Sequence, residues 1–108
     1  MSDTLLVLTN LPDTADARAL ATDLVEQRLA ACVNILAPCT SVYRWQDEIE
    51  TATEVPLLIK TTAARYAELE AAILARHPYE LPEIIAVPVK PGLPGYLGWI
   101  AAETAPGD

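Results

Sequence analysis

The sequence predicts one α+β domain with the element order β-α-β-β-α-β and one more helix at the end, which is the ferredoxin-like split βαβ arrangement. Two segments, residues 13–29 and 63–76, repeat their apolar residues with helical periodicity. Runs typical of strands lie before, between and after them, at residues 5–9, 40–61 and 83–89. The chain has 108 residues, so we expect residues 1–108 to form a single domain with one core.

The first strand and the first helix have the clearest signals. Residues 5–9 form a continuous apolar run that ends at the turn signal of residues 10–13. Asp13 or Thr14 can cap the helix that follows. The apolar residues of this helix recur at i, i+3, i+4 and i+7, and they are Ala17, Leu20, Ala21, Leu24, Val25 and Leu29.

The middle of the chain predicts an unusually long β-hairpin. A strand over residues 32–36 is interrupted at Pro38 and resumes over residues 40–45. After a turn at residues 46–48, a strand returns as far as residue 61. Pro56 lies within the returning strand, and because proline lacks an N–H it predicts a bulge or an edge position there.

The second half of the chain predicts a helix, a strand and a last short helix. Thr62 is expected to cap residues 63–76, and His77-Pro78 ends that helix because proline disfavours a helical residue before it. The inward residues of the helix are expected to be Tyr66, Leu69, Ile73 and Leu74. The last helix is expected over residues 96–103, followed by a frayed tail from about residue 104.

This order places both main helices on one face of an antiparallel sheet. The strands carry apolar residues on both alternations, for example in residues 5–8, 57–59 and 84–87. Because a solvated face would alternate with polar residues, the second face is expected to be buried against another subunit. The sequence therefore favours an oligomer.

Charge and composition exclude several classes of partner. The chain has 15 acidic and 7 basic residues, a net charge of −8, which repels nucleic acid and anionic membrane surfaces. It has no signal-peptide pattern and no apolar stretch long enough to span a membrane. Cys32 and Cys39 form no motif, which favours a reducing cytoplasm over a disulfide framework.

Catalytic templates are missing, so we expect no enzyme. His77 is the only histidine, which excludes a multi-histidine metal cage within one chain. The four glycines fall near the C-terminus and form no phosphate-binding loop. Cys32 follows the first helix and is interpreted first as a small buried apolar residue and second as a metal ligand. Lys60 is interpreted as the partner of Glu54 or Glu83 in an ion pair.

The segment from His77 to Glu83 concentrates the polar chemistry of the chain. It holds a histidine, a phenol and two carboxylates within seven residues, together with Pro78 and Pro82. Two interpretations stay open: a structural turn in which His77 ends a helix, or a polar recess lined by His77, Tyr79, Glu80 and Glu83. The second predicts that Tyr79 and Glu83 lie within reach of Lys60, or of Trp45 from a neighbouring subunit.

Five sequence blocks, in this order and spacing, resemble the CutA family of divalent-cation tolerance proteins. They cover nearly the whole chain, from about residue 5 to residue 100. The blocks are Leu29-Ala30-Ala31-Cys32-Val33-Asn34-Ile35, Ser41-Val42-Tyr43-Arg44-Trp45, Ile59-Lys60-Thr61, His77-Pro78-Tyr79-Glu80-Leu81-Pro82-Glu83-Ile84 and Tyr96-Leu97-Gly98-Trp99.

The resemblance implies a homotrimer with the architecture of the PII signalling proteins, in which each long hairpin reaches across a neighbour. It also implies a response to divalent metal ions, with copper binding in some members, and ligand clefts between subunits. The candidate cleft residues are Trp45, Lys60, Tyr79, Glu80 and Glu83, and the candidate metal ligands are His77 and Cys32.

The chain departs from the copper-binding members at two positions. Thr9 stands where they have a cysteine, and Arg76 stands where they have a second histidine. A lone imidazole per chain is a poor copper site unless other subunits or carboxylates complete it, so we expect weak copper binding. Two other functions stay open: a trimeric scaffold for a partner protein, with an indirect link to metal, and an enzyme that uses His77 as base with Glu83 orienting it.

Overall fold

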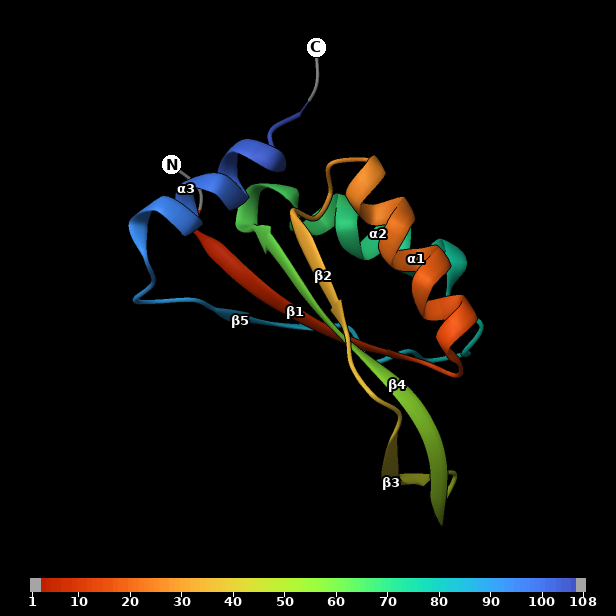
Figure 1. Cartoon of the computed structure of the whole chain (residues 1–108). Coiled ribbons are helices and arrows are strands. Elements are labelled where there is room, and N and C mark those ends of the chain that lie inside the picture. Colours follow the sequence, from red (N-terminus) through yellow and green to blue (C-terminus); the bar gives the residue numbers. More distant parts are fainter. Residues whose placement is uncertain (1–2, 107–108) are drawn as a thin grey trace.

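The computed structural model describes residues 3–106 and confirms the predicted order of elements (Figure 1). A short 3₁₀ turn, η1, precedes the second helix. The elements are β1 (Thr4–Leu11), α1 (Thr14–Glu26), β2 (Cys32–Ile35), β3 (Cys39–Trp45), β4 (Glu48–Thr62), η1 (Ala63–Arg65), α2 (Tyr66–Arg76), β5 (Ile85–Pro88) and α3 (Pro94–Glu103).

The sheet is antiparallel, with the strand order β2-β4-β1-β5, and β3 pairs with the far half of β4. Helices α1 and α2 cover the same face (Figure 1). This is the split βαβ arrangement that the sequence predicts. The core lies between the two helices and the sheet, and its fully buried residues include Val7, Leu11, Leu20, Leu24, Val55, Leu57, Ile59, Leu69 and Ile73.

Helix α1 begins at the predicted cap and ends earlier than its apolar pattern suggests. The Asp13 carboxylate accepts a hydrogen bond of 2.8 Å from the Asp16 N–H, which satisfies a free donor of the first turn. At the other end Arg28 has a left-handed φ of 60°. Leu29 therefore reaches the core from the turn after the helix, and the prediction that Val25 faces inward is wrong, since Val25 is exposed.

The expected bulge or edge position at Pro56 is wrong, because β4 is central and continuous through this residue. Pro56 faces Asn10 of β1, and its carbonyl accepts a hydrogen bond of 2.9 Å from Leu36 N–H. Pairing with β2 ends at Leu57 and pairing with β3 begins at Glu54. The chain opposite Pro56 on this side of β4 is the interruption between β2 and β3. No ladder hydrogen bond is therefore lost because proline lacks an N–H.

The hairpin of β3 and β4 extends well beyond the body of the sheet (Figure 1). Its turn residues Gln46 and Asp47 have positive φ values of 50° and 66°, the backbone of a two-residue turn whose twist matches the strands. Asp47 tolerates this conformation because its short polar side chain can hydrogen-bond locally. The projection makes the molecule elongated, with a longest extent of 44 Å.

The second helical segment starts as a 3₁₀ turn rather than as an α-helix. Thr62 occupies the cap position of η1, but its side chain makes no capping hydrogen bond, contrary to expectation. Leu69 and Ile73 are buried and Tyr66 is half-buried, as predicted. Leu74 is exposed, so its predicted inward position is wrong.

The face of the sheet opposite α1 and α2 is apolar. Leu6 and Leu8 pair with Val87 and Ile85 of β5, and all four side chains lie on this face because paired residues share a side. Ile85 is 55% and Val87 48% exposed. Only one end of the face is near α3, where the Lys60 ammonium lies 5.8 Å from the centre of the Tyr96 ring.

The C-terminal region is ordered further than the sequence suggests. Thr104 is buried, and its hydroxyl donates a hydrogen bond of 2.8 Å to the Ile100 carbonyl, so a tail frayed from residue 104 is wrong for this residue. Residues 107–108 of that tail lie outside the described residues. The predicted last strand, residues 83–89, is shorter in the structure, at Ile85–Pro88. Within residues 3–106 no helix is long and apolar enough to cross a membrane.

Candidate functional site

A cleft of about 720 Å³ opens between the hairpin and the segment that follows α2. Three segments far apart in the sequence form its walls: the end of β1, the hairpin, and residues 79–83. The lining residues are Asn10, Ser41, Val42, Tyr43, Trp45, Ala52, Glu54, Tyr79, Glu80, Leu81 and Glu83.

His77 fixes the wall formed by residues 79–83. Its Nε2 donates a hydrogen bond of 2.7 Å to the Asn10 carbonyl, and its Nδ1 accepts one of 3.2 Å from the Tyr79 N–H. Because a carbonyl only accepts and an amide N–H only donates, the ring is the neutral tautomer that carries its proton on Nε2. Both nitrogens are therefore engaged, and the ring packs 4.7 Å from that of Tyr79.

Two further polar contacts hold the cleft together. The Asn10 side-chain amide donates a hydrogen bond of 3.2 Å to Glu83 Oε1, so Asn10 contacts the segment after α2 through both its backbone and its side chain. The Tyr79 phenol also lies close to the Glu54 carboxylate of β4, close enough for that carboxylate to act on its pKa. Burial raises the pKa of Tyr79 to about 12, and Glu54 adds to the shift because a carboxylate disfavours a second negative charge nearby.

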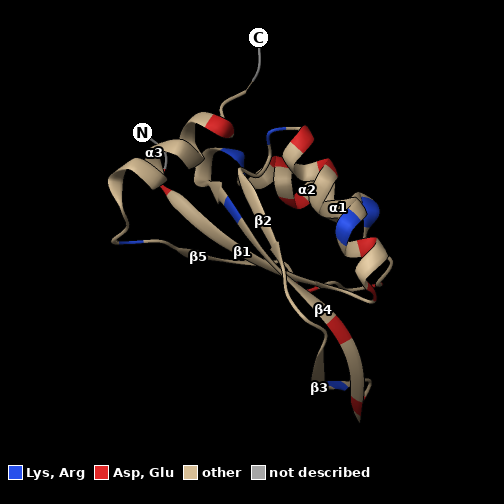
Figure 2. Cartoon of the chain, viewed as in Figure 1, with Lys and Arg blue, Asp and Glu red and all other residues tan. Residues whose placement is uncertain are grey.

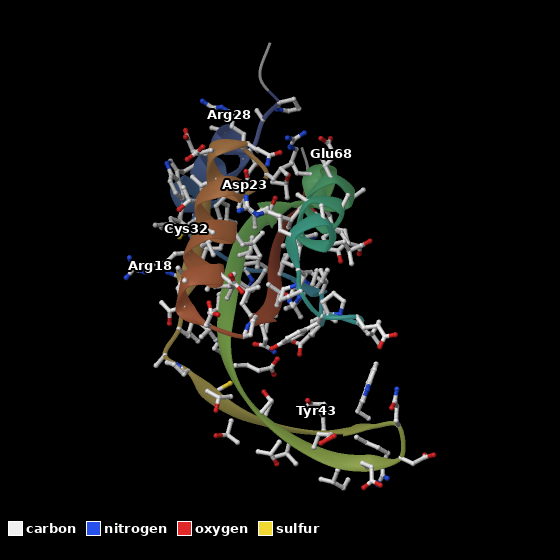
Figure 3. All side chains as sticks on the ribbon, turned by 90° about the vertical axis from the view of Figure 1, so that its right-hand side faces the viewer. Arg18, Asp23, Arg28, Cys32, Tyr43 and Glu68 are labelled. Atoms are coloured by element: carbon white, nitrogen blue, oxygen red, sulfur yellow. The ribbon has the colours of Figure 1, made fainter. Side chains whose placement is uncertain are left out.

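The hairpin contributes one face of each strand to the cleft. Ser41, Tyr43 and Trp45 alternate along β3, so their side chains lie on the same side, and Ala52 lies opposite Ser41 in the register. Figure 3 shows Tyr43 on the curved part of the hairpin that projects from the body. The cleft wall is thus partly aromatic.

The cleft carries negative charge on two of its three walls. Glu54, Glu80 and Glu83 line it, and no lysine or arginine does so in the part of the chain that the structure describes. Figure 2 shows that the charges of β4 are separated along the strand: an acidic segment lies toward the hairpin and a basic one near the other end of the sheet. The cleft can therefore hold a cation.

Comparison with known proteins places the chain in a family. The family model of the CutA1 divalent ion tolerance protein matches residues 5–103. The Divalent-cation tolerance protein CutA of Thermus thermophilus is 46% identical over 99 residues, which are 92% of this chain and 96% of that protein. The chain belongs to the CutA family.

Solved structures of CutA proteins share the fold. The CutA crystal structure from Xylella fastidiosa has a TM-score of 0.93 and 47% identity, and the match covers 96% of this chain and 100% of that one. The periplasmic divalent cation tolerance protein CutA from Archaeoglobus fulgidus has a TM-score of 0.91 and 35% identity, with 94% and 99% covered. The vertebrate relatives are longer, and the chain spans 59% of the Xenopus laevis homologue.

Within this CutA chain, the structure brings together four of the five predicted cleft residues and leaves one out. Trp45, Tyr79, Glu80 and Glu83 line the same cleft, with Trp45 coming from the same chain. Lys60 is not among the lining residues. It lies six residues from Glu54 along β4, which corresponds to roughly 20 Å in an extended strand.

The expected ion pair of Lys60 with Glu54 or Glu83 is therefore wrong. The Lys60 ammonium donates a hydrogen bond of 2.7 Å to Asn34 Oδ1 and lies 4.0 Å from the Cys32 sulfur. These three residues lie together on the apolar face of the sheet, because Cys32 and Asn34 pair with Lys60 and Leu58. Cys32 is half-buried there, which corrects its interpretation as a core residue.

The candidate metal ligands lie apart in this CutA chain. Cys32 is on the apolar face, whereas Thr9, the position of the missing cysteine, is fully buried on the helix-covered face. Both nitrogens of His77 are already hydrogen-bonded. Among residues 3–106 no group of three or more His, Cys, Asp or Glu side chains could hold a metal ion.

Sequence reasoning missed Asn10, Ser41, Tyr43 and Glu54 as cleft residues. For three of them a signal exists: Ser41 and Tyr43 share the alternation of Trp45, and Glu54 is the acidic residue closest to the point where the hairpin leaves the sheet. Asn10 carries no comparable signal, because it reads as a turn residue and its role depends on where α2 ends.

Proposed function

We propose that this chain works as a homotrimer in tolerance to divalent cations, and that it binds a small ligand or a divalent ion at clefts where subunits meet. Family membership supports the first part, because the names of its CutA relatives describe divalent-cation tolerance. Those names describe a tolerance protein and not a catalyst, and the proposal assigns no reaction to the cleft.

The observation that carries the ligand-binding part of the proposal is the cleft that a single chain forms. Trp45, Tyr79, Glu80 and Glu83 come from two segments far apart in the sequence and meet around one open cavity. The segment of residues 79–83 is held by hydrogen bonds to Asn10 and stiffened by prolines, which lowers the ordering cost of presenting polar groups. A turn that only connects two elements requires none of these groups.

The apolar face of the sheet supports the trimer, with the architecture of the PII proteins. Ile85 and Val87 are about half exposed in a single chain and continue the apolar surface of Leu6 and Leu8. Contiguous exposed apolar surface of this kind is typical of an interface between subunits. In the proposed trimer each long hairpin lies against a neighbour.

A divalent ion is what the family name suggests for this proposal, and copper is the ion that the resemblance to copper-binding members implies. Within one chain His77 can bind a metal only if it gives up one of its two hydrogen bonds. A complete ligand set then requires carboxylates or other donors from neighbouring subunits. The proposed metal site is therefore weak and shared.

We further propose a cytoplasmic location. Cys32 and Cys39 are both free thiols, and unpaired cysteines suit a reducing compartment.

A second candidate function is a trimeric scaffold that holds a partner protein, with an indirect link to metal. The exposed apolar residues of the hairpin favour it: Val42 and Ile49 are mostly exposed on the projecting strands. Exposed apolar residues on a projecting hairpin suit contact with another protein.

The fluorescence of Trp45 offers a direct experiment. Replacing Trp99 with Phe leaves Trp45 as the only tryptophan, so its emission reports on the cleft. Titration of this variant with copper, zinc and a panel of small ions and metabolites should give a saturable change for at least one ligand, and Glu83→Gln should weaken that binding without dissociating the trimer. If no ligand of the panel changes the Trp45 emission and a partner protein binds the hairpin, the scaffold function would be favoured.

A further inference from the structure

The walls of the cleft combine aromatic rings with carboxylates. Tyr43, Trp45 and Tyr79 supply the rings, and Glu54 is the half-buried carboxylate among them. The faces of aromatic rings carry negative charge and attract cations, and a carboxylate beside them adds a hydrogen-bond acceptor. Both wall components therefore select for positive charge.

Tyr79 adds a neutral phenol to the cleft wall beside the Glu54 carboxylate. Its phenol lies close to Glu54, and burial together with this carboxylate raises the pKa of Tyr79 to about 12. The phenol thus stays protonated near neutral pH. Glu54 has spare acceptor capacity, because an ionised carboxylate has about four lone-pair positions and one neighbouring phenol can use only one of them. Tyr43 lies close enough to contribute to the same electrostatic environment.

The shape of the cleft favours a cation larger than a metal ion. Its carboxylates do not converge, since no group of three ligand side chains in the described range could hold a metal. The volume of about 720 Å³ falls in the range of clefts that bind small organic molecules, roughly 300–1,000 Å³. Glu80 and Glu83 lie on the wall formed by residues 79–83, and Glu54 lies on the hairpin wall, so negative charge is available at two places.

We infer that the cleft binds an organic ammonium cation with an alkyl body, of the class of linear diamines. The ammonium group lies against Tyr43, Tyr79 and Glu54, the alkyl chain packs on the aromatic wall, and Glu80 or Glu83 faces the second charge. This inference rests on the proposed function of the cleft as a ligand site and names the class of its ligand.

The test uses the full-length Trp99→Phe protein, with Trp45 as the reporter and cadaverine as the probe. Pentanediol is the matched neutral control, because it has the same carbon chain with hydroxyls in place of the ammonium groups. Cadaverine should change Trp45 emission saturably, and pentanediol should not. Raising the salt concentration should weaken cadaverine binding, because the attraction is electrostatic.

Two variants and one control locate the binding. Glu54→Gln should weaken cadaverine binding about tenfold or more, because it removes a charge-assisted hydrogen bond. Glu80→Gln, at an exposed position, should weaken it by a smaller factor and keeps the test valid if Glu54→Gln fails to fold. Glu26→Gln changes the net charge equally but lies at the end of α1, outside the cleft, and should leave the affinity unchanged.

Each of the following outcomes overturns the inference. Together they distinguish a failure of the inference from a failure of the proposed function. Equal responses to cadaverine and pentanediol, or an equal loss in Glu54→Gln and Glu26→Gln, would show that the cleft does not select ammonium groups. A response of Trp45 to copper or to an anion, with none to cadaverine, would refute the inference and keep the cleft as a ligand site. If no ligand changes the Trp45 emission, both the inference and the proposed role of the cleft as a ligand site would be refuted.

Discussion

The backbone carbonyl of Asn10 accepts a hydrogen bond of 2.7 Å from Nε2 of His77, a residue 67 positions further along the chain. The bond joins the end of β1 to the segment that follows α2. The other ring nitrogen of His77 accepts from the Tyr79 N–H, so one imidazole holds β1 and the cleft wall in register. The only histidine of the chain is in this way a structural residue of the cleft.

Replacing His77 with Ala should therefore destabilise the protein. The change removes two hydrogen bonds of a half-buried ring, each of which contributes about 0.5–1.5 kcal/mol, so the free energy of unfolding should fall by about 1–3 kcal/mol. Urea unfolding at one fixed protein concentration measures it. Glu80→Gln, at an exposed neighbouring position, is the control, and equal stability of the two variants would refute the structural role of His77.

Tyr79 should titrate at unusually high pH. Because the folded state raises its pKa from 10.0 to about 12, the folded protein holds this proton more tightly than the unfolded chain. The stabilisation is fully present below about pH 10 and is lost as the pH rises toward 12.

Phenolate absorbance measures this titration when circular dichroism is followed alongside it. Tyr66, whose pKa is also raised, contributes to the same signal. The difference between the wild type and Tyr79→Phe isolates the Tyr79 component, which should have its midpoint near 12. A difference curve centred on 10 in a protein that is still folded would contradict the burial of Tyr79 beside Glu54.

Thr9 carries a buried hydroxyl that has no hydrogen-bond partner among the described residues. Its side chain is fully buried between the sheet and the helices. Valine has nearly the same shape without the hydroxyl, so Thr9→Val should raise the free energy of unfolding by about 1 kcal/mol. Thermal unfolding measures this, and Thr61→Val is the matched control: the Thr61 hydroxyl donates to the Leu29 carbonyl, so its loss should destabilise the protein. Destabilisation by Thr9→Val would mean that the hydroxyl is satisfied in solution.

The fold was predictable because its signals are local. Asp13 caps α1 and Pro78 ends α2, and both effects act within one turn of the residue itself. The contacts of Asn10, Lys60 and Pro56 were not predictable in the same way. Those of Lys60 and Pro56 depend on what the sheet register places beside the residue, and those of Asn10 depend on where α2 ends. The sequence pattern of a single strand contains neither piece of information.

The cleft was predictable in part for the same reason. Trp45, Tyr79, Glu80 and Glu83 belong to conspicuous sequence blocks, whereas Glu54 joins the site only because the hairpin curves toward residues 79–83. Lys60 also belongs to such a block, but it lies on the apolar face of the sheet and not in the cleft. Membership of a sequence block therefore does not show that a residue lies in the cleft.

Copper(II) should bind weakly. Both nitrogens of His77 are engaged, and Thr9 and Arg76 supply neither thiolate nor imidazole. Calorimetric titration of untagged protein should therefore give a low affinity, and an equimolar aminocarboxylate chelator should remove the metal completely. Retention of copper against the chelator, lost in His77→Ala, would contradict this expectation and show that the ring leaves its hydrogen bonds for a metal. If the His77→Ala variant also retains copper against the chelator, Cys32 becomes the candidate ligand.

The mass in solution tests the central claim, a trimer that buries the apolar face of the sheet and forms clefts between subunits. Sedimentation of the wild type should give three times the 11.6 kDa chain mass, and this should persist on dilution. Val87→Glu places a charge on the proposed interface and should give monomers, whereas Glu26→Gln should stay trimeric. A wild-type mass of 11.6 kDa at every concentration, with melting independent of concentration, would contradict the account.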